Sequence, residues 1–552
     1  MDRSGRNCTR RLERSSTRRF PRVVLSGVLV TVLALAGTSG HAAPTILYTD
    51  LVTGPNSGGE DDHGAYLTLF GARFGEAQGS SRVTINNLPV AAYKQWSDAK
   101  ITVQPGQGVS SGPIRVVVSG QSSNADHSFA VVPGKIFFVS LKGSDESGKV
   151  GDIGRPFRSA QRTFDRRDFG PGDHLVLRGG DWTDNNKIYD AFLSVHHKSG
   201  TAQAPIVVMG YPTESVNISR TSSNGVTRAI HSYETVGHYV IANLHVNMNK
   251  GGGTCIGIAP GTSNVRVVNN EAQGMFDDGG GSGCITGSGK RYRILGNHVH
   301  DNGGNKLYHA LYFDARDKTG PTDIEIAYNH IHHQGGGRGI QIYGDTDTPI
   351  NNVRVHHNVI HDIALDGILL GRDSGVGYLV YNNLVYRAAD VALRGSSLDS
   401  GKGGGCLRFD SPGLVARVYN NTFADCALDK DPESGGIRFQ RAKEIALANN
   451  IVSGRYYVEI GSMPETFTSS NNLWYGGGLS PLWDRSSVHG NPGFVDEQGG
   501  NFRIQKAGSG IDRGSATVEA IVRDDLDGLA RPQGAGYDIG AFELTKSAGS
   551  PQ

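Results

Sequence analysis

The chain has 552 residues with a formal net charge of +1, and 78 of the residues are glycine. This length exceeds that of one ordinary compact domain, so it predicts two or three domains, or a long repeat array with an added module. Because the charges balance, net charge alone gives no attraction to a polyanion, and we expect no nucleic-acid partner. The high glycine content favours turns and short strands over helices.

Residues 1–43 have the pattern of a signal peptide. Basic residues crowd positions 3–22, an apolar run follows at 23–37, and Ala42 and Ala43 offer small residues for cleavage. The apolar run is short for a bilayer span, and an uncleaved anchor is the alternative. We therefore expect a secreted or periplasmic monomer with no stable membrane span after signal cleavage.

Residues 45–133 alternate apolar and polar positions between turn signals, which predicts a small β-sandwich. The segments that carry the pattern are GAYLTLFGARFGEA, SRVTINNLPV, YKQWSDAKITVQP and GPIRVVVSGQSSNADHSFAVV. With their G-x-x-F-G and W-S-D motifs, they resemble the immunoglobulin-like IPT/TIG family. The resemblance implies a spacer or a carbohydrate-binding module, because nothing in the segment looks catalytic.

From residue 134 onward an asparagine recurs before an apolar residue, every 22 to 38 residues. The last Asn of each occurrence is Asn243, Asn270, Asn297, Asn329, Asn358, Asn383, Asn421, Asn450 or Asn472. Each spacing suits one three-strand coil with variable turns. Asn tolerates the left-handed bend between two strands, and stacked Asn side chains can hydrogen-bond the next coil. The repeat therefore predicts a solenoid.

The start of this region, KIFFVSLKGSDESGKVGDIGRPFRSAQRTFD followed by GPGDHLVLRGGDW, resembles secreted right-handed parallel β-helix proteins of the pectate-lyase-like superfamily. Residues 512–543 resemble the closing segment of such proteins. The resemblance implies an all-β chain in which a right-handed three-strand parallel β-helix spans 134–511. It also implies that residues 512–552 form a capping segment over the last coil, and a tail.

A third strand follows in each coil, as in ALYFD (310–314), GIQIY (339–343) and CLRFD (406–410). Period-two alternation predicts that apolar side chains point inward. These are Leu311, Phe313, Ile340, Ile342, Ile368, Leu370, Leu407, Phe409, Ile437 and Phe439. The same alternation predicts an outward ladder of Tyr312, Gln341, Leu369, Arg408 and Arg438, spaced roughly 5 Å apart.

In the superfamily that the chain resembles, the substrate groove lies over this third-strand face, walled by the preceding turns. Cations line those turns and the far ends of the strands: Lys306, Arg338, Arg394, Lys402, Lys430, Arg316, Lys318 and Arg372. Such a strip suits an acidic polysaccharide. We expect the substrate-binding residues to be Gln341, Tyr343, Arg372, Lys402, Arg408 and Arg438.

Cleavage of a uronate polymer by β-elimination needs a cation that neutralises the carboxylate and a base that removes the C5 proton. We predict that Lys306 is the base, that Arg338 is the neutraliser, and that His309 and Tyr312 orient or assist. Lys306 as a solvated loop cation and His309 as a turn-stabilising residue are the alternatives. Since no contiguous lyase signature is found, the assignment depends on position in the coil.

Two other sets of residues compete with this site. One set is four aspartates, Asp277, Asp278, Asp345 and Asp347. They could catalyse glycoside hydrolysis or bind Ca²⁺ as a cofactor. The alternative is that they only form tight turns, which also favour Asp. Eight histidines could bind a metal: His298, His300, His330, His332, His333, His356, His357 and His361. A stacked surface ladder is favoured for them, because His300, His332 and His361 each follow a repeat Asn by three residues. A non-catalytic glycan-binding β-helix is the third functional class.

Four cysteines remain after residue 43: Cys255, Cys284, Cys406 and Cys426. Export permits disulfides, and three pairings are possible. The pairs Cys255–Cys284 and Cys406–Cys426 are the local ones.

Overall fold

The computed structural model describes residues 42–186, 190–221, 226–276, 282–314, 322–344, 348–372, 375–393, 403–428 and 433–545. These residues lie in one compact unit that begins at Ala42. The predicted signal peptide falls almost entirely outside them. Within the described ranges, no helix is long and apolar enough to cross a membrane.

The first module is the predicted β-sandwich. One sheet has the order β1 (Thr45–Thr49), β3 (Leu67–Ala72), β7 (Lys100–Gln104) and β6 (Ala92–Trp96). The other has the order β2 (Thr53–Gly54), β10 (Ser128–Val131), β8 (Gly112–Val118), β4 (Arg82–Ile85) and β5 (Leu88–Pro89), with β9 (Gln121–Ser122) on β8. Alternate residues such as Leu69 and Val116 are fully buried between the sheets.

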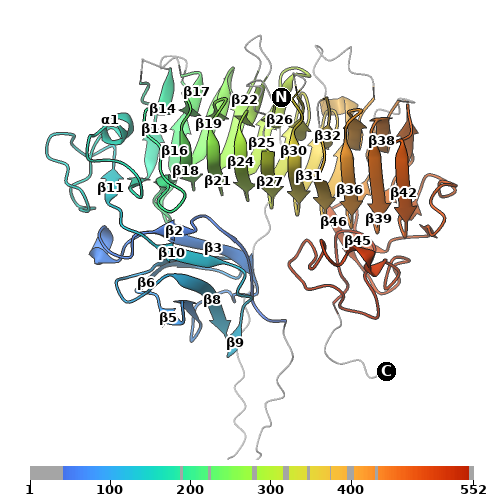
Figure 1. Ribbon diagram of the computed structural model, residues 1–552, viewed down its shortest axis with the longest axis horizontal. Helices are drawn as coiled ribbons and strands as arrows, with labels where there is room; N and C mark the ends of the chain where they lie inside the picture. Colours follow the sequence, from blue (N-terminus) through green and yellow to red (C-terminus); the bar gives the residue numbers. More distant parts are fainter. Residues whose placement is uncertain are drawn as a thin grey trace, which may run out of the picture. The chain divides into compact units, whose positions relative to one another are not determined.

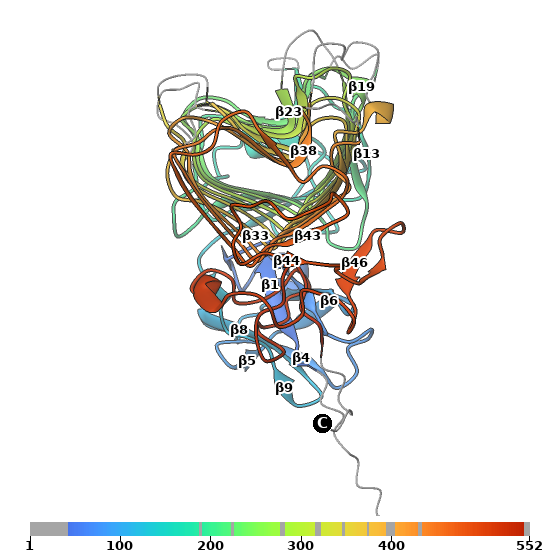
Figure 2. The ribbon, with the colours of Figure 1, turned by 90° about the vertical axis from the view of Figure 1, so that its right-hand side faces the viewer.

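The second module is a parallel β-helix whose coils supply three sheets (Figures 1 and 2). The first sheet contains β11 (Ile136–Val139), β12 (His174–Leu177), β15 (Ile206–Gly210), β18 (Gly237–Ala242), β21 (Ser263–Val268), β24 (Lys290–Leu295), β27 (Thr322–Ala327), β30 (Asn351–His356), β33 (Tyr378–Tyr381), β36 (Val415–Tyr419), β39 (Glu444–Ala448) and β42 (Thr466–Ser470). Helix α1 (Ala160–Phe164) follows β11 and packs Phe164 into the solenoid core.

The second sheet follows the asparagine turn of each coil. It contains β13 (Gly180–Trp182), β16 (Val216–Ser219), β19 (His245–Gly251), β22 (Glu271–Met275), β25 (His298–Asn302), β28 (His330–Gln334), β31 (Val359–Ile363), β34 (Leu384–Ala388), β37 (Thr422–Ala424), β40 (Ile451–Ser453), β43 (Leu473–Tyr475) and β44 (Val488–His489).

The third sheet carries the predicted groove face. It contains β14 (Ala191–Val195), β17 (Arg228–Ser232), β20 (Thr254–Ile258), β23 (Ser282–Gly287), β26 (Tyr308–Phe313), β29 (Ile340–Ile342), β32 (Ile368–Leu370), β35 (Gly405–Asp410), β38 (Gly435–Arg441) and β41 (Val458–Ile460). All ten side chains predicted to point inward are fully buried in the core of the solenoid. Period-two alternation was therefore sufficient to orient these strands.

The asparagine ladder forms as predicted from Asn270 to Asn472. Each Asn Nδ2 donates to the Oδ1 of the next ladder Asn at 2.8–3.0 Å. A second bond from Nδ2 to a strand carbonyl, such as Asn329 to Ile294 O at 2.9 Å, satisfies the buried amide. These bonds tie consecutive coils together inside the turn.

The left-handed bend, however, belongs to the residue before the ladder Asn. Residues at that position have φ between 51° and 63°: Asn269, Gly296, Tyr328, His357, Asn382, Asn420, Asn449 and Asn471. Asn243 is one of these bend residues, with φ 58°, so assigning it to the ladder was wrong. Leu244 takes the ladder position there, and its N–H donates to Asn270 Oδ1. Tolerance of the left-handed bend therefore favours Asn at the first of two adjacent positions, and hydrogen bonding to the next coil favours Asn at the second.

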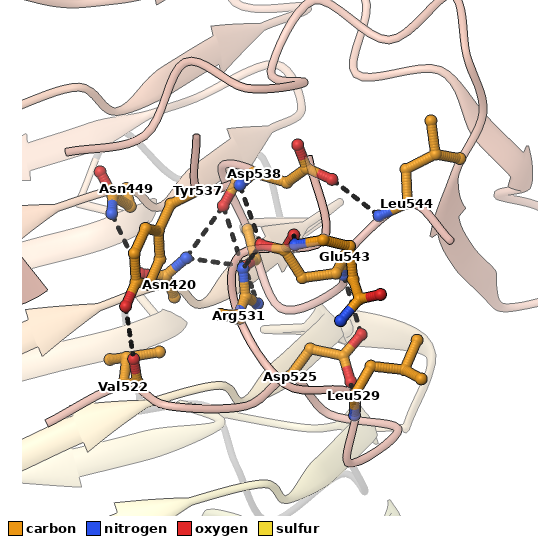
Figure 3. A network of polar contacts seen from close by, with 12 residues as sticks. Asn420, Asn449, Val522, Asp525, Leu529, Arg531, Tyr537, Asp538, Glu543 and Leu544 are labelled. Carbon is orange, nitrogen blue, oxygen red and sulfur yellow. Dashed lines mark hydrogen bonds and ion pairs between the residues drawn. The ribbon is translucent and has the colours of Figure 1, made fainter. Parts of the chain in front are cut away.

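The bend asparagines bind the closing segment of the chain through its main chain. Asn382 donates to Asp524 O at 2.8 Å, Asn420 to Asp538 O at 3.0 Å, and Asn449 to Ser515 O at 2.9 Å. A buried Arg531–Glu543 ion pair at 2.8 Å organises the segment (Figure 3). The segment therefore lies along the turns of several coils, whereas we expected it to cap only the last one.

Both local disulfides are formed, Cys255–Cys284 and Cys406–Cys426. The first joins β20 to β23, which are neighbours in the third sheet. The second joins β35 to the segment after β37.

Candidate functional site

The predicted outward ladder is present in the third sheet. The register pairs Tyr312 with Gln341, Gln341 with Leu369, Leu369 with Arg408, and Arg408 with Arg438. The ladder ends at Glu459, which pairs with Arg438. Parallel pairing thus aligns one side chain from each coil along a single row.

This row is less open than an exposed groove face would be. Tyr312 is 9 % exposed, Gln341 6 % and Arg438 2 %. Part of the covering comes from Arg338, in the turn before β29, whose Nη1 donates to Gln341 Oε1 at 2.9 Å. His309, which the structure places inside β26 and not in the turn, lies with its ring 5.4 Å from that of Tyr312.

A second row comes from the residues two positions before Leu311, Ile340 and Ile368, which are partners in register. The residues of this row are His309, Arg338 and Asp366. Gly405 continues the row, since Leu407 pairs with Ile368. A Cβ at Gly405 would lie 2.1 Å from Gly435 O and 3.2 Å from Arg438 Cγ. Glycine therefore leaves room for the Arg438 side chain.

Asp366 is the centre of the site, and its side chain is fully buried. Arg338 Nε donates to its Oδ2 at 2.8 Å, Arg438 Nη1 lies 3.5 Å from its Oδ1, and Arg408 Nη1 lies 3.9 Å from its Oδ2. Burial opposes ionisation, but the charges of these three arginines outweigh it and lower the pKa of Asp366. The carboxylate is therefore ionised at neutral pH.

Two of the arginines have a further acidic partner. Arg408 Nη2 lies 2.7 Å from Asp410 Oδ2, and Arg438 Nε lies 3.4 Å from Glu459 Oε2. Within the part of the chain that the structure describes, Arg408 Nε and Arg438 Nε are nevertheless buried without a hydrogen-bond acceptor.

His309 is buried beside Arg338. Its Nδ1 accepts a hydrogen bond from the main-chain N–H of Arg338 at 3.1 Å. Burial, with the charge of Arg338 as the smaller cause, lowers the pKa of His309 well below its usual value. The imidazole is neutral, with Nδ1 as acceptor and Nε2 left to carry the proton, so it suits positioning rather than proton removal.

The remaining predicted residues lie around this centre. Lys306 is half-buried in the turn before β26, three residues before His309. Tyr343 follows β29. Its ring packs against Gly371, where an added Cβ would lie 2.4 Å from Tyr343 Cδ2. Arg372 is exposed beyond β32. Lys402, Asp277, Asp278, Asp345 and Asp347 lie outside the described residues, as do Arg316, Lys318, Arg394 and Lys430.

The sequence reasoning missed Asp366, Asp410 and Glu459. A signal for Asp366 was present, because Asp366-Gly367-Ile368 repeats the coil position of Arg338-Gly339-Ile340. Aligning successive coils by their glycines would have placed this acid beside the predicted cation.

The histidines on the second sheet stack as predicted. The rings of His300 and His332 are 5.1 Å apart and within 10° of parallel, and those of His332 and His361 are 5.1 Å apart and within 8°. His298 and His330 stack beside them at 5.2 Å. His356 instead ends β30, and His357 follows it in the asparagine turn, where its Nε2 lies 3.3 Å from Asp524 Oδ1.

Comparisons with known proteins agree with this architecture. Residues 207–385 match the family model of a right handed beta helix region, and residues 52–131 match that of the IPT/TIG domain. No curated protein matches the chain.

Several solved structures are similar to the chain. Pectate lyase Pel9A is 13 % identical, with a TM-score of 0.49 over 75 % of this chain and 96 % of its own. The alginate lyase from Paenibacillus sp. str. FPU-7 is 15 % identical, with a TM-score of 0.35 over 60 % of this chain and 90 % of its own. The A-module of the Azotobacter vinelandii mannuronan C-5 epimerase AlgE6 is 11 % identical, with a TM-score of 0.35 over 57 % of this chain and 89 % of its own. From the two family matches and its own sheets, the chain combines an IPT/TIG domain with a right-handed parallel β-helix.

Proposed function

We propose that this protein is an exported enzyme that cleaves a uronate-containing polysaccharide, alginate-like in charge, by β-elimination. The observation that carries the proposal is the cluster of Arg338, Arg408 and Arg438 on one sheet face, gathered around the buried Asp366. A row of guanidinium groups in register with the coils suits the carboxylates of a linear polymer.

In the proposed reaction Arg338 binds the carboxylate beside the C5 carbon. Asp366 and Gln341 hold its Nε and Nη1, so the direction of the guanidinium is fixed before substrate binds. A preorganised cation stabilises the charge that develops on the carboxylate when the C5 proton leaves. Asp366 is thus a positioning residue that acts through Arg338.

Lys306 is the proposed base that removes the C5 proton. It lies in the turn that precedes β26, three residues before His309. A lysine must lose its own proton before it can act as a base. The neutral His309 holds the main chain of Arg338, and Tyr312 packs against the His309 ring.

Glycoside hydrolysis is the second candidate, and Asp366 does not support it. A hydrolase needs a protonated carboxyl group as general acid, whose pKa is raised. The arginines around Asp366 lower its pKa, so it remains ionised. The hydrolase therefore depends on Asp277, Asp278, Asp345 and Asp347, which lie outside the described residues. A non-catalytic glycan-binding β-helix is the third candidate.

Export is part of the proposal. The N-terminal segment has the pattern of a signal peptide, and two disulfides need an oxidising compartment to persist.

The test is to incubate the purified protein with alginate, pectate, glycosaminoglycans and neutral glycans. Ultraviolet absorbance of the unsaturated uronate product and the number of reducing ends are followed together. We expect both to rise on an acidic polymer and neither on a neutral one. Reducing ends without absorbance would contradict elimination and favour hydrolysis, and binding without new chain ends would favour the non-catalytic alternative.

A further inference from the structure

A cluster of histidines covers the outward face of three consecutive coils in the second sheet. His298 and His330 are partners in one row, and His300, His332 and His361 are partners in the next row. Both rows repeat at the strand spacing of roughly 5 Å. Strands β25, β28 and β31 therefore hold imidazole rings against one another on a single surface.

The ring nitrogens in this cluster converge. His298 Nε2 lies 2.7 Å from His332 Nε2, and His330 Nε2 lies 2.9 Å from His361 Nε2. One ring nitrogen from each of His298, His330 and His332 lies within 4.8 Å of the other two. Tetrahedral zinc with Zn–N bonds of about 2.0–2.1 Å separates its ligands by roughly 3.3 Å. Small rotations of these rings would therefore give coordination distances.

Carboxylates fix the ring protons of two histidines that flank the converging nitrogens, His361 and His300. His361 Nδ1 lies 2.6 Å from Asp362 Oδ2, and His300 Nδ1 lies 2.7 Å from Asp301 Oδ2. Both aspartates have a left-handed backbone, with φ of 54° and 51°, which turns each side chain back toward the preceding histidine. A carboxylate on Nδ1 places the proton there, so these two flanking rings have Nε2 as their acceptor nitrogen. Glu271 adds negative charge at the edge of the cluster, with its Oε1 3.4 Å from His300 Nε2.

We propose that His298, His330 and His332 bind a divalent transition-metal ion, zinc first, with water completing the coordination. Imidazole nitrogens suit zinc, copper, nickel and iron, whereas calcium and magnesium prefer oxygen. The site would connect strands of two consecutive coils. It lies on a different sheet from the arginine cluster and does not depend on the proposed lyase activity.

The test begins with the full chain freed of metal by a chelator. Zinc is titrated by calorimetry, and cobalt is added separately to read its visible spectrum. We expect about one zinc per chain with micromolar or tighter affinity, and a cobalt spectrum typical of four-coordinate nitrogen ligation. His298→Gln, His330→Gln and His332→Gln should each weaken zinc binding at least about tenfold. His489→Gln is the matched control, because His489 is an exposed histidine of the same sheet, and it should change nothing.

Three outcomes would overturn the proposal. Absence of zinc binding to the wild-type chain would leave the cluster a stacked scaffold. Equal binding by wild type and the His298→Gln/His332→Gln double variant would place the metal elsewhere. A second group, Glu271, His298 and His300, shares His298. Loss of binding in Glu271→Gln together with normal binding in His330→Gln would therefore assign the metal to that group. Because His330 is exposed and His298 and His332 are half-buried, the substitutions leave the solenoid core intact.

Discussion

Arg338 and Asp366 occupy equivalent positions in two successive coils, and a 2.8 Å hydrogen bond joins Arg338 Nε to Asp366 Oδ2. The acid is fully buried, and two further arginines reach it from the next coils. In a parallel β-helix, one position per coil thus builds a charged row that no single strand could hold. The stability of this row and the direction of Arg338 depend on the same carboxylate.

Asp366→Asn should strongly destabilise the protein. The substitution removes the charge that compensates three partly buried guanidinium groups, and breaking a buried ion pair in this way costs about 3–5 kcal/mol. The free energy of unfolding is measured by urea titration. Asp168→Asn, at an exposed ion pair with Arg166, is the control and should have little effect. Equal stability of the Asp366→Asn variant and the wild type would mean that the arginines do not need Asp366.

The contribution of Asp366 should disappear in acid. Because the folded protein lowers its pKa, the unfolded chain binds the proton more readily. The stabilisation is therefore present above the unfolded pKa of about 3.9 and is lost as the pH falls through the lower folded value. The difference in urea midpoint between wild type and Asp366→Asn should be large at pH 7 and shrink below pH 4. A difference that grows in acid would reverse the assigned direction.

The fold was predictable because its signals are repeated. The inward residues follow period two in every third strand, and the ladder asparagines recur once per coil, so an error at one position is corrected by the others. The different roles of Asn449 and Asn450 were not predictable from residue type, because both are asparagine. Only the backbone shows that the first bends the chain, with φ 59°, and the second hydrogen-bonds the next coil.

The candidate site was less predictable, since it depends on contacts between side chains of different coils. Arg338, Arg408 and Arg438 were identified from their coil positions, but their shared partner was not. Asp366 stands between a leucine and a glycine in a turn, a setting in which Asp is common for local reasons. The covering of Tyr312 and Gln341 was not predictable, because period two gives the direction of a side chain and not what covers it.

Asn329→Ala should destabilise the solenoid although it lies far from the charged row. The side-chain oxygen of Asn329 accepts bonds from Asn297 N and Nδ2, and its amide donates to Ile294 O. Each buried group left without a partner costs about 1–3 kcal/mol, so the total should reach about 3 kcal/mol or more. Thermal unfolding followed by circular dichroism measures the loss. The exposed Asn491→Ala is the control; an equal effect of both substitutions would mean that the ladder contributes no special stability.

Reduction of the disulfides should lower stability without unfolding the chain. The Cys255–Cys284 bond closes a loop of 29 residues, for which the chain-entropy model gives about 3–4 kcal/mol. The Cys255→Ala/Cys284→Ala double variant should therefore unfold at lower urea than wild type and keep the same circular dichroism spectrum. Non-reducing peptide mapping checks the pairing directly. Peptides linking Cys255 to Cys406 would contradict it.

Arg338→Lys and Lys306→Ala should separate the two roles proposed for the reaction. A lysine at 338 cannot bond Asp366 and Gln341 together while also presenting N–H groups to a substrate carboxylate. We expect kcat/KM for elimination to fall by about 10²–10³, the loss typical of removing one preorganised donor. Lys306→Ala should lower kcat by a comparable factor of about 10²–10⁴ with little change in KM, because a base acts only in the transition state.

The control for both variants is Lys506→Ala, an exposed cation near the C-terminal end, which should keep full activity. Full activity of Lys306→Ala would assign the base to another residue while leaving the Arg338 result unaffected. A rise in KM alone for Arg338→Lys would show that Arg338 binds substrate and transition state equally, which contradicts its role as neutraliser. The two variants therefore test the base and the neutraliser independently, since the role assigned to one residue does not have to be correct for the role of the other to be tested.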